Sequence, residues 1–389
     1  MKKKLNVALV GSGFMGRAHS FAWANVGRFF DTDFEPVLKA ISSLDGTINE
    51  FAEKQGWEEV AADWRDLVSR DDIDIVDICA PTFLHHDVFI EAAGNGKHIF
   101  CEKPAAVTYL QAKEMAEAAD KAGIVHYLNH NYRRVPAVAY AKQLIDEGRL
   151  GQIYHWRGAY IQDWVMNPNF PLTWHFQKEM AGGGPHFDLN SHLVDIARYL
   201  VGEIESVTGL NKTFIKERPL PGEKAGTFSS GGDQSATQTG PVTIDDACFF
   251  VCDFENGALG SFDTTRFGSG RKNWNDFEIY GSKGAVSFNF ESMNELYFLD
   301  LEDPVAEQGY KRISVTLGDH PYAGAWWGPG HILGYENAFF HAAADFLNAI
   351  SKGAEVKPNL HDGAACIRVL EAVNKAIEEK RVVYVKEII

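Results

Sequence analysis

Two short stretches carry the side chains best suited to acid–base chemistry. In C-E-K-P, residues 101–104, Lys103 follows an expected strand, and the proline after it restricts the lysine backbone. In G-G-G-P-H-F-D-L-N-S-H, residues 182–192, Asp188 and His192 are four apart and would share one face of a helix. A carboxylate beside an imidazole can orient the ring and stabilise its protonated form, which suits a general base. A cationic lysine near the reacting oxygen would stabilise a developing alkoxide.

Each stretch also has a plainer interpretation. A lysine at the end of a strand is commonly a solvated side chain. Asp188 could cap a helix beside a buried His192, or the two could form part of a metal site. No third ligand with convincing spacing accompanies them, so no metal is predicted. The residue types indicate proton transfer and leave the helix cap open as an alternative.

A glycine-rich turn, G-S-G-F-M-G at residues 11–16, follows the apolar run 5–10 and precedes an expected helix. Strand, turn and helix in this order are the context that a dinucleotide-binding fingerprint requires. Gly11 would permit the tight turn, Gly13 would let a pyrophosphate approach the backbone, and Gly16 would let helix and strand pack closely. The helix N-terminus would add free N–H groups and the positive end of its dipole. A turn without any ligand is the alternative.

Strand and helix alternate through the first third of the chain. Apolar runs predict strands at 5–10, 36–41, 73–79, 98–101 and 124–128. Helical patterns are found at 14–29, 48–55, 86–94 and 110–122. This alternation indicates βαβ units. We therefore predict an α/β fold whose residues 1–129 form a doubly wound, NAD(P)-binding Rossmann domain, and the alternation favours a cofactor at the glycine-rich turn.

From about residue 130 the alternation stops. Strands are predicted at 153–162, 207–213, 247–253, 257–265, 277–280 and 285–290, and helices around His192 and at 334–350 and 363–380. Residues 130–389 are thus expected to form an α+β domain with a large, mostly antiparallel sheet. Residues 219–241 are typical of a flexible loop. The loop 320–331, with adjacent tryptophans, is either a wall for a sugar substrate or a segment that its aromatic rings pin in place.

Composition limits the class of protein. A chain of 389 residues is long enough for two domains. The formal net charge of -16 argues against nucleic acid or an anionic membrane surface as a partner. The five cysteines include no C-x-x-C pair, which favours a reducing compartment over a disulfide scaffold or a zinc ribbon. The first apolar run is too short for a signal peptide, so a cytoplasmic location is expected.

The cofactor type depends on the end of the second predicted strand. Ser42 and Ser43 stand where an acidic residue usually holds the adenosine ribose, and Asp45 comes two residues late. Residues 41–50 contain no arginine for the 2′-phosphate of NADP. NAD is therefore favoured, with NADP as the alternative.

Together these motifs resemble one large family, the glucose–fructose oxidoreductase / inositol dehydrogenase / MocA-like oxidoreductases. The resemblance extends over almost the whole chain and includes A-P-T-F-L-H at 80–85, with Thr82 where asparagine is usual, and N-Y-R-R at 131–134. Within the family the chain is most similar to the levoglucosan dehydrogenase and glucoside 3-dehydrogenase branch. That similarity rests on I-Q-D-W at 161–164, W-H-F-Q-K at 174–178 and A-R-Y-L-V-G at 197–202.

The resemblance implies an NAD(P)-dependent oxidoreductase that moves a hydride between the nicotinamide and a secondary hydroxyl of a sugar, anhydrosugar, glucoside or inositol. It implies catalytic roles for Lys103, Asp188 and His192. Cofactor contacts are expected from Gly11, Gly13, Phe14, Met15, Gly16, Ser43, Pro81, Thr82, His85, Glu102 and Lys103. Substrate contacts are expected from Lys103, Tyr132, Arg133, Trp164, Asp188 and His192.

A homo-oligomer, dimer or tetramer, is expected to form through the C-terminal sheet. Two other functions stay open. A retained NAD could serve a redox-neutral epimerase, lyase or glycosidase reaction, or the chain could be an NAD-binding regulator without turnover. The joint presence of Lys103, Asp188 and His192 argues against the regulator, as does the lack of a basic footprint for nucleic acid.

Overall fold

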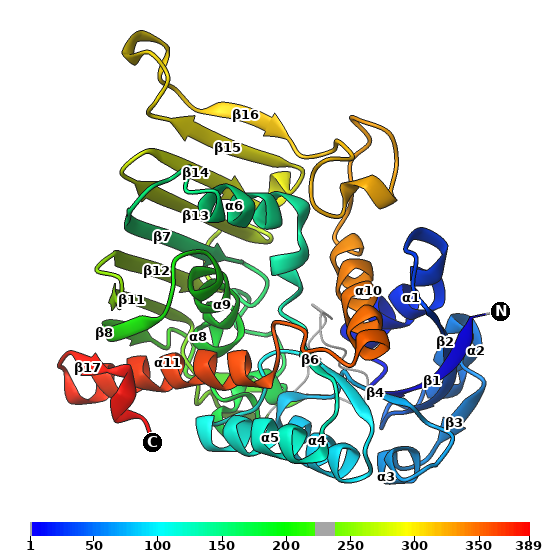
Figure 1. The fold of residues 1–389 in the computed structure, drawn as a ribbon. Helices are drawn as coiled ribbons and strands as arrows, with labels where there is room; N and C mark the ends of the chain where they lie inside the picture. Colours follow the sequence, from blue (N-terminus) through cyan, green and yellow to red (C-terminus); the bar gives the residue numbers. More distant parts are fainter. Residues whose placement is uncertain (1, 222–237) are drawn as a thin grey trace. The chain divides into compact units, whose positions relative to one another are not determined.

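The structure, a computed structural model, describes residues 2–221 and 238–389 (Figure 1). The chain divides into two compact units. The first comprises Met1–Asn131 and Tyr335–Ile367, and the second comprises Tyr132–Gly334 and Arg368–Ile389. The chain therefore passes between the units near residue 130, where a boundary was expected, and again after Gly334 and after Ile367.

The first unit contains a six-stranded sheet in the order β3-β2-β1-β4-β5-β6, in which neighbours pair in parallel. Its strands are β1 (Lys3–Val10), β2 (Phe34–Ser42), β3 (Glu59–Ala61), β4 (Ile75–Ile78), β5 (His98–Cys101) and β6 (His126–Leu128). Every residue of β4 is buried, as expected for a parallel strand covered on both faces. The predicted doubly wound sheet is confirmed.

Helices connect these strands. They are α1 (Phe14–Phe29), α2 (Ile48–Gln55), α3 (Trp64–Val68), α4 (His85–Gly94) and α5 (Tyr109–Ala122). The helix α10 (Asn337–Lys352) belongs to the same unit but comes later in the chain. Local chemistry sets the ends of α5: the Thr108 side chain accepts a bond from the Gln111 amide, and Gly123 closes the helix at φ 64. The sequence did not predict β3 and α3, because both are short and β3 is largely exposed.

The strand order reverses between β1 and β4, and ligands of open α/β sheets bind at the carboxyl ends of the strands at such a point. Three loops leave those ends: the glycine turn after β1, Cys79–Thr82 after β4, and Glu102–Pro104 after β5. The sheet thus places the predicted cofactor motifs at one edge.

The second unit contains a nine-stranded sheet in the order β16-β15-β14-β13-β7-β12-β11-β8-β17. Strands β7 and β12 pair in parallel and the other neighbours pair antiparallel, which confirms the predicted mostly antiparallel sheet. The strands are β7 (Ile153–Ile161), β8 (Ile204–Lys212), β11 (Ala247–Phe254), β12 (Leu259–Thr265), β13 (Trp274–Gly281), β14 (Gly284–Asn289), β15 (Glu295–Asp300), β16 (Lys311–Ser314) and β17 (Val383–Tyr384).

Helices α6 (Pro136–Asp146), α8 (Pro185–Asp188) and α9 (Asn190–Leu200) pack on one face of this sheet (Figure 1). Buried and exposed residues alternate along β11, as expected for a strand with one covered face. Stacked rings fill the covered side, including Trp156 on Phe277 at 5.2 Å and Phe250 on Phe262 at 4.2 Å between centroids. The face that carries α9 is therefore the core face.

Other predicted segments have mixed outcomes. The predicted terminal helices correspond to α10 and to α11 (Leu360–Glu379). Of the expected loop 219–241, the ends belong to β9 (Glu217–Pro219) and β10 (Thr239–Pro241), which pair with each other, while 222–237 lies outside the described residues. Across the described ranges, the helices are all too short or too polar to cross a membrane.

Candidate active site

The three glycines of the turn differ in how much space the surrounding protein leaves for a side chain. A Cβ on Gly11, at φ 110, would lie 2.5 Å from the carbonyl oxygen of Cys79. A Cβ on Gly16 would lie 2.2 Å from the carbonyl oxygen of Gly11. A Cβ on Gly13, by contrast, would meet nothing within 4 Å. The protein's own packing therefore requires Gly11 and Gly16, whereas Gly13 leaves space for another molecule.

The start of α1 fits the pyrophosphate of a dinucleotide. Gly13 is the N-cap, no side chain bonds the cap, and the first turn holds no acidic residue. The N-terminus of a helix presents backbone N–H groups and the positive end of its dipole, which suit an anion. Phe14 and Met15 follow at the mouth of the turn, where Phe14 is 49% exposed and the Tyr335 ring lies 5.9 Å away.

The end of β2 carries hydroxyl groups. Ser12 Oγ donates to Ser43 Oγ at 2.9 Å, so Ser43 lies beside the glycine turn. Asp45 is turned to its own loop, where its carboxylate accepts bonds from the amide and hydroxyl of Thr47 at 2.9 Å. Ser43 is therefore a better candidate than Asp45 for the residue that binds the adenosine ribose.

The loops after β4 and β5 are joined through His85. Its Nδ1 lies 3.0 Å from the Pro104 carbonyl oxygen and its Nε2 lies 2.8 Å from that of Ala80. Burial lowers the pKa of His85, although the two backbone carbonyl groups act in the opposite direction. Pro81 and Thr82 lie between Ala80 and His85 in the fixed loop. From the protein interior, His85 thus fixes the two loops at the carboxyl ends of β4 and β5, where the cofactor is expected to bind.

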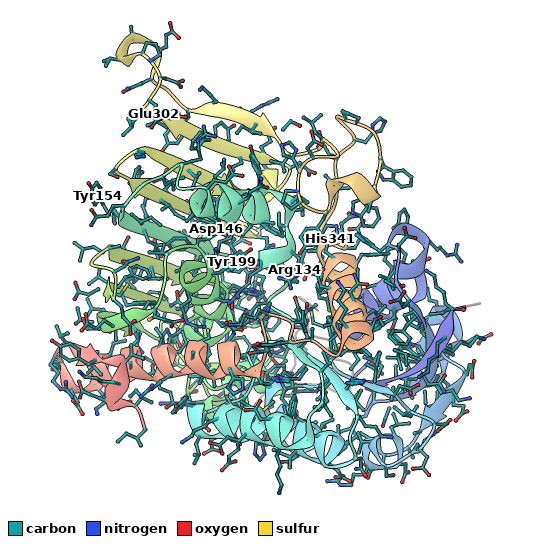
Figure 2. All side chains as sticks on the ribbon, viewed as in Figure 1. Arg134, Asp146, Tyr154, Tyr199, Glu302 and His341 are labelled. Atoms are coloured by element: carbon teal, nitrogen blue, oxygen red, sulfur yellow. The ribbon has the colours of Figure 1, made fainter. Side chains whose placement is uncertain are left out.

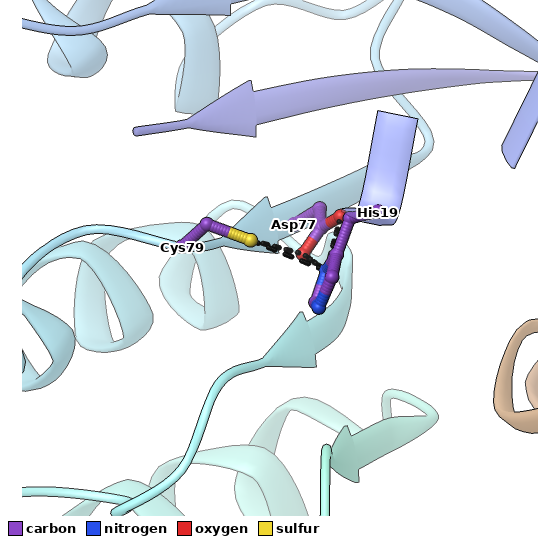
Figure 3. A group of neighbouring side chains, drawn as sticks. All are labelled: His19, Asp77 and Cys79. Atoms are coloured by element: carbon purple, nitrogen blue, oxygen red, sulfur yellow. Dashed lines mark hydrogen bonds and ion pairs between the residues drawn. The ribbon is translucent and has the colours of Figure 1, made fainter. Parts of the chain in front are cut away.

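A buried cluster that the sequence did not predict lies behind the same edge, and Figure 3 shows two of its residues, His19 and Asp77, with the neighbouring Cys79. His19 of α1 places Nδ1 2.9 Å from Asp77 Oδ1 of β4 and Nε2 2.9 Å from Glu102 Oε1 after β5. Asn129 donates to the same Glu102 oxygen at 2.6 Å, and Trp23 donates to Asp77 at 2.7 Å. We call His19, Asp77, Glu102, Asn129 and Trp23 the His19 cluster.

Glu102 and Lys103, adjacent in sequence, differ in exposure. Glu102 is 4% exposed and its carboxylate belongs to the His19 cluster, whereas Lys103 is half-buried. The Lys103 amide donates to Glu102 Oε2 at 3.1 Å, and the Lys103–Pro104 peptide bond is cis. Glu102, predicted to contact the cofactor, is instead directed into the interior, where it supports the lysine segment.

In the second unit, glycines 182–184 are required by packing. A Cβ on Gly184 would lie 1.8 Å from the carbonyl oxygen of Asp245. The Asp245 carboxylate accepts bonds from the amides of Gly184 at 2.8 Å and His186 at 2.9 Å, which fixes the start of α8. His186 Nε2 lies 2.8 Å from the Leu370 carbonyl oxygen, and burial lowers the pKa of this histidine. His186 is therefore a structural histidine.

Asp188 and His192 have different neighbours from those the sequence suggested. They lie on successive helices, α8 and α9, rather than on one helix. Asp188 Oδ2 accepts a bond from Arg266 Nη2 at 2.5 Å, and this guanidinium stands over the Trp164 ring at 5.3 Å. No sequence pattern indicated Arg266, which is 78 residues from Asp188.

His192, 6% exposed, packs among tyrosines. Its ring stacks on Tyr132 at 4.3 Å and lies 5.8 Å from the Tyr160 ring. The two tyrosine hydroxyls are 2.9 Å apart, and the Tyr160 hydroxyl donates to Asn273 Oδ1 at 2.7 Å. Gln162 extends this chain, because it donates to Asn273 at 2.9 Å and accepts from Trp164 Nε1 at 2.8 Å. Tyr132, Trp164 and His192, all predicted at the site, thus belong to one network.

Arg133 has a different position from the one predicted. It forms a buried bidentate pair with Asp195, with N–O distances of 2.7 and 2.6 Å, and its guanidinium lies 4.9 Å from the Tyr199 ring centroid (Figure 2 labels Tyr199). A buried bidentate pair of this kind fixes α9 to the segment before α6. The geometry favours a structural role for Arg133 over a substrate contact.

Comparisons with known proteins identify the family of each domain and similar proteins over the full length. Residues 5–130 match the model of the oxidoreductase family with an NAD-binding Rossmann fold, and residues 138–287 match the GFO/IDH/MocA C-terminal domain. Levoglucosan dehydrogenase of Pseudarthrobacter phenanthrenivorans is 40% identical over 391 residues, covering 99% of each chain. The solved structure of a levoglucosan dehydrogenase with NADH and levoglucosan has a TM-score of 0.92 at 40% identity, covering 98% of this chain and 99% of that one.

A more distant relative is named as a hydratase and not as a dehydrogenase. The 2,7-anhydro-N-acetylneuraminate hydratase of Escherichia coli is 28% identical over 290 residues, covering 74% of this chain and 68% of that one.

Proposed function

Because this chain belongs to the GFO/IDH/MocA oxidoreductase family and has its NAD-binding Rossmann domain, we propose that it oxidises a secondary hydroxyl of a cyclic sugar. An anhydrosugar of the levoglucosan type is the first candidate substrate. The observation that carries this proposal is the full-length similarity to levoglucosan dehydrogenase, at 40% identity over 99% of both chains. Glucosides and inositols are the next candidates.

The first unit holds the cofactor. Gly11, Gly13 and Gly16 shape the start of α1 for the pyrophosphate, with Phe14 and Met15 at its mouth. Ser43, Pro81, Thr82 and Lys103 complete the contacts along the carboxyl edge of the sheet. When bound, NAD supplies an acceptor for the hydride from the substrate carbon. Glu102 and His85 act behind this surface, through the loops that they fix.

His192 is the general base of the proposed reaction. When the secondary hydroxyl is oxidised to a carbonyl, the O–H proton would pass to the imidazole of His192. The 4.3 Å stack on Tyr132 holds the ring in one orientation, as an effective base requires. In the same proposal, the Lys103 ammonium stabilises the negative charge that develops on this oxygen.

Asp188 orients the substrate in this proposal. Its side chain is 36% exposed, so the carboxylate remains accessible although Arg266 holds one of its oxygens. An ionised carboxylate can accept several hydrogen bonds, so Asp188 can accept one from a sugar hydroxyl as well. The Arg266 guanidinium fixes the direction of that bond.

The sugar ring itself would lie against the tyrosine–amide network. Trp164 offers an apolar ring, while Gln162, Asn273 and the tyrosine hydroxyls offer donors and acceptors at fixed positions. Sites for polar rings combine such surfaces with a few placed polar groups. The loop 320–331, where Trp327 is 58% exposed, is a second candidate wall.

We also propose that copies of the chain associate through the outer face of the nine-stranded sheet. Large apolar side chains are exposed on this face: Leu210, Phe249, Val251, Leu259 and Tyr280. Phe249 pairs with Leu210 across β8 and β11, so the exposed groups are adjacent. Exposed apolar patches of this kind mark interaction surfaces. Sedimentation analysis tests this: Phe249→Glu should yield monomers, and a wild-type monomer would contradict it.

A substrate panel tests the function. Levoglucosan, glucose, glucosides and inositols are offered with NAD and with NADP, and the absorbance of the reduced nicotinamide is followed. Reduction of NAD with one of the sugars is expected. A different result would support the redox-neutral alternative: no sugar reduces added NAD, but the protein retains a non-exchanging cofactor and converts a sugar. The similarity to a hydratase is the observation that favours this alternative.

A further inference from the structure

The His19 cluster contains a histidine whose charge the geometry decides. Its two ring nitrogens each lie 2.9 Å from a carboxylate oxygen, of Asp77 and of Glu102. Asn129 Nδ2 also lies 3.0 Å from Nε2, and Cys79 Sγ lies 3.2 Å from Nδ1. Because an ionised carboxylate can only accept hydrogen bonds, both carboxylate contacts are hydrogen bonds only when both ring nitrogens carry a proton. The ring is then an imidazolium buried between two carboxylates.

Electrostatics supports this charge state. Burial by itself would lower the pKa of His19, but Asp77 and Cys79 outweigh burial and raise this pKa well above its usual value. Burial would likewise raise the pKa of Glu102, but the hydrogen bond and charge of His19, then the charge of Lys103, hold it below its usual value. Glu102 is therefore an ionised carboxylate next to two cations.

A metal ion is the competing occupant of this cluster. The ligand atoms of His19, Asp77 and Cys79 lie within 4.8 Å of one another. A metal would need a lone pair on His19 and a thiolate on Cys79, since thiols and imidazoliums do not ligate. Both ring nitrogens face carboxylates, and burial raises the pKa of the Cys79 thiol. The cluster thus holds a proton where a metal would otherwise sit.

The ring is also fixed in position. The Phe100 ring is nearly perpendicular to the imidazole at 5.3 Å between centroids, and the centroid of the Phe339 ring lies 5.4 Å away. Trp23 Nε1 donates to Asp77 Oδ2 at 2.7 Å, and this oxygen also lies 3.0 Å from His19 Nδ1. With this packing, His19 cannot turn away from Glu102, and the positive charge remains beside that carboxylate.

Glu102 connects this charge to Lys103. One carboxylate oxygen, Oε1, is shared by His19 and Asn129, and the other, Oε2, accepts the Lys103 amide at 3.1 Å. We propose that His19 is a positioning residue for Lys103: it neutralises Glu102, so that the lysine ammonium is directed to the substrate oxygen and not back to the carboxylate. This inference rests on the proposed role of Lys103 in stabilising that oxygen.

A double-mutant cycle tests the inference. The rate of hydride transfer from levoglucosan to NAD is measured in single turnovers for wild type, His19→Gln, Lys103→Ala and the double variant. We expect His19→Gln to slow the reaction about tenfold in the wild-type background. In the Lys103→Ala background, His19→Gln should slow hydride transfer by less than about twofold, because the lysine side chain that His19 positions is absent.

His98→Gln is the matched control. His98 begins β5, the strand that ends before Glu102, and its Nδ1 accepts the Val125 amide at 3.0 Å. We expect this change to lower the melting temperature and to leave the rate per folded molecule unchanged. The double variant His19→Gln/Glu102→Gln removes one positive and one negative charge together. It is expected to react faster than His19→Gln alone. If His19→Gln does not fold, this double variant takes its place in the test.

The outcomes separate the inference from the function on which it rests. If Lys103→Ala is slow but the two effects multiply, His19 acts elsewhere and the inference is overturned, whereas the role of Lys103 stands. If Lys103→Ala reacts at the wild-type rate, the role of Lys103 in the proposed function is wrong.

Discussion

His19 in the first unit and His192 in the second are both buried, at 1% and 6% exposure, yet their neighbours differ. His19 lies between the carboxylates of Asp77 and Glu102. His192 stacks on the ring of Tyr132, close to Tyr160. Two carboxylates fix a proton on each nitrogen of a ring, whereas aromatic neighbours orient a ring without fixing its charge.

One residue type can therefore serve two purposes in one chain. A ring held as a cation cannot accept a proton, so His19 is unsuited to be a base and suited to be a permanent charge. A ring oriented by stacking can take up and release a proton, as the proposed role of His192 requires. Burial alone does not separate these roles; the partners of the ring nitrogens and the ring faces do.

The largest effect is expected from His192→Asn. Loss of a general base should slow hydride transfer by roughly 10²–10⁴-fold, and the binding of NAD should change little. Single-turnover rates and NAD titrations measure the two quantities. His186→Asn is the matched comparison from the same segment, and it should lower thermal stability but leave the rate per folded molecule intact. Equal rates for wild type and His192→Asn would place the base elsewhere, with Tyr132 the next residue to test.

A smaller effect, confined to cofactor binding, is expected from Gly13→Val. The new Cβ meets no protein atom within 4 Å, so the fold should persist while the pyrophosphate is displaced. The NAD dissociation constant should rise at least about tenfold. Gly27→Val is the control on the same helix, because a Cβ there also meets nothing within 4 Å. Equal NAD affinity in the two variants would mean that the glycine turn binds no pyrophosphate.

The pH dependence of stability sharpens the contrast between the two histidines. Because the folded-state pKa of His19 lies well above 6.5, its ion pairs stabilise the fold fully below that pH, and their contribution is lost as pH rises through the raised pKa. The urea midpoint should therefore fall on the alkaline side in wild type and less steeply in His19→Gln. Parallel curves for the two proteins would contradict a charged His19.

The smallest effect concerns cofactor choice. Ser43 bonds to Ser12 at the end of β2, and no arginine occurs in residues 41–50 to hold a 2′-phosphate. NAD should be used at least as well as NADP. Steady-state kinetics with both cofactors measures this, and a strong preference for NADP would show that an unidentified cation binds the phosphate.

Features that depend on local sequence were predictable. The glycine turn, the alternation of strands and helices and the two stretches around Lys103 and His192 could be recognised, because each lies within a few dozen residues of chain. The His19 cluster could not, since Asp77 and Glu102 are 58 and 83 residues from His19. No local pattern reports which distant side chain will meet a buried imidazole.

Arg133 shows the limit of a local motif. Its place in N-Y-R-R suggested a substrate contact, whereas in the structure it forms a buried bidentate pair with Asp195, 62 residues away. Burying a charged group without partners is costly, so a buried guanidinium is normally paired or hydrogen-bonded. Both arginines of the motif, Arg133 and Arg134, are buried, and the motif does not show which distant groups they contact.

The most direct test of the account is the pH dependence of single-turnover hydride transfer from levoglucosan in wild type and in His192→Asn. We predict that the wild-type rate falls on the acid side through one ionisation, as the base becomes protonated. We also predict that His192→Asn, although it binds NAD, is slow and lacks this limb. A variant that keeps the same acid limb would contradict the account, because the ionisation would then belong to another group.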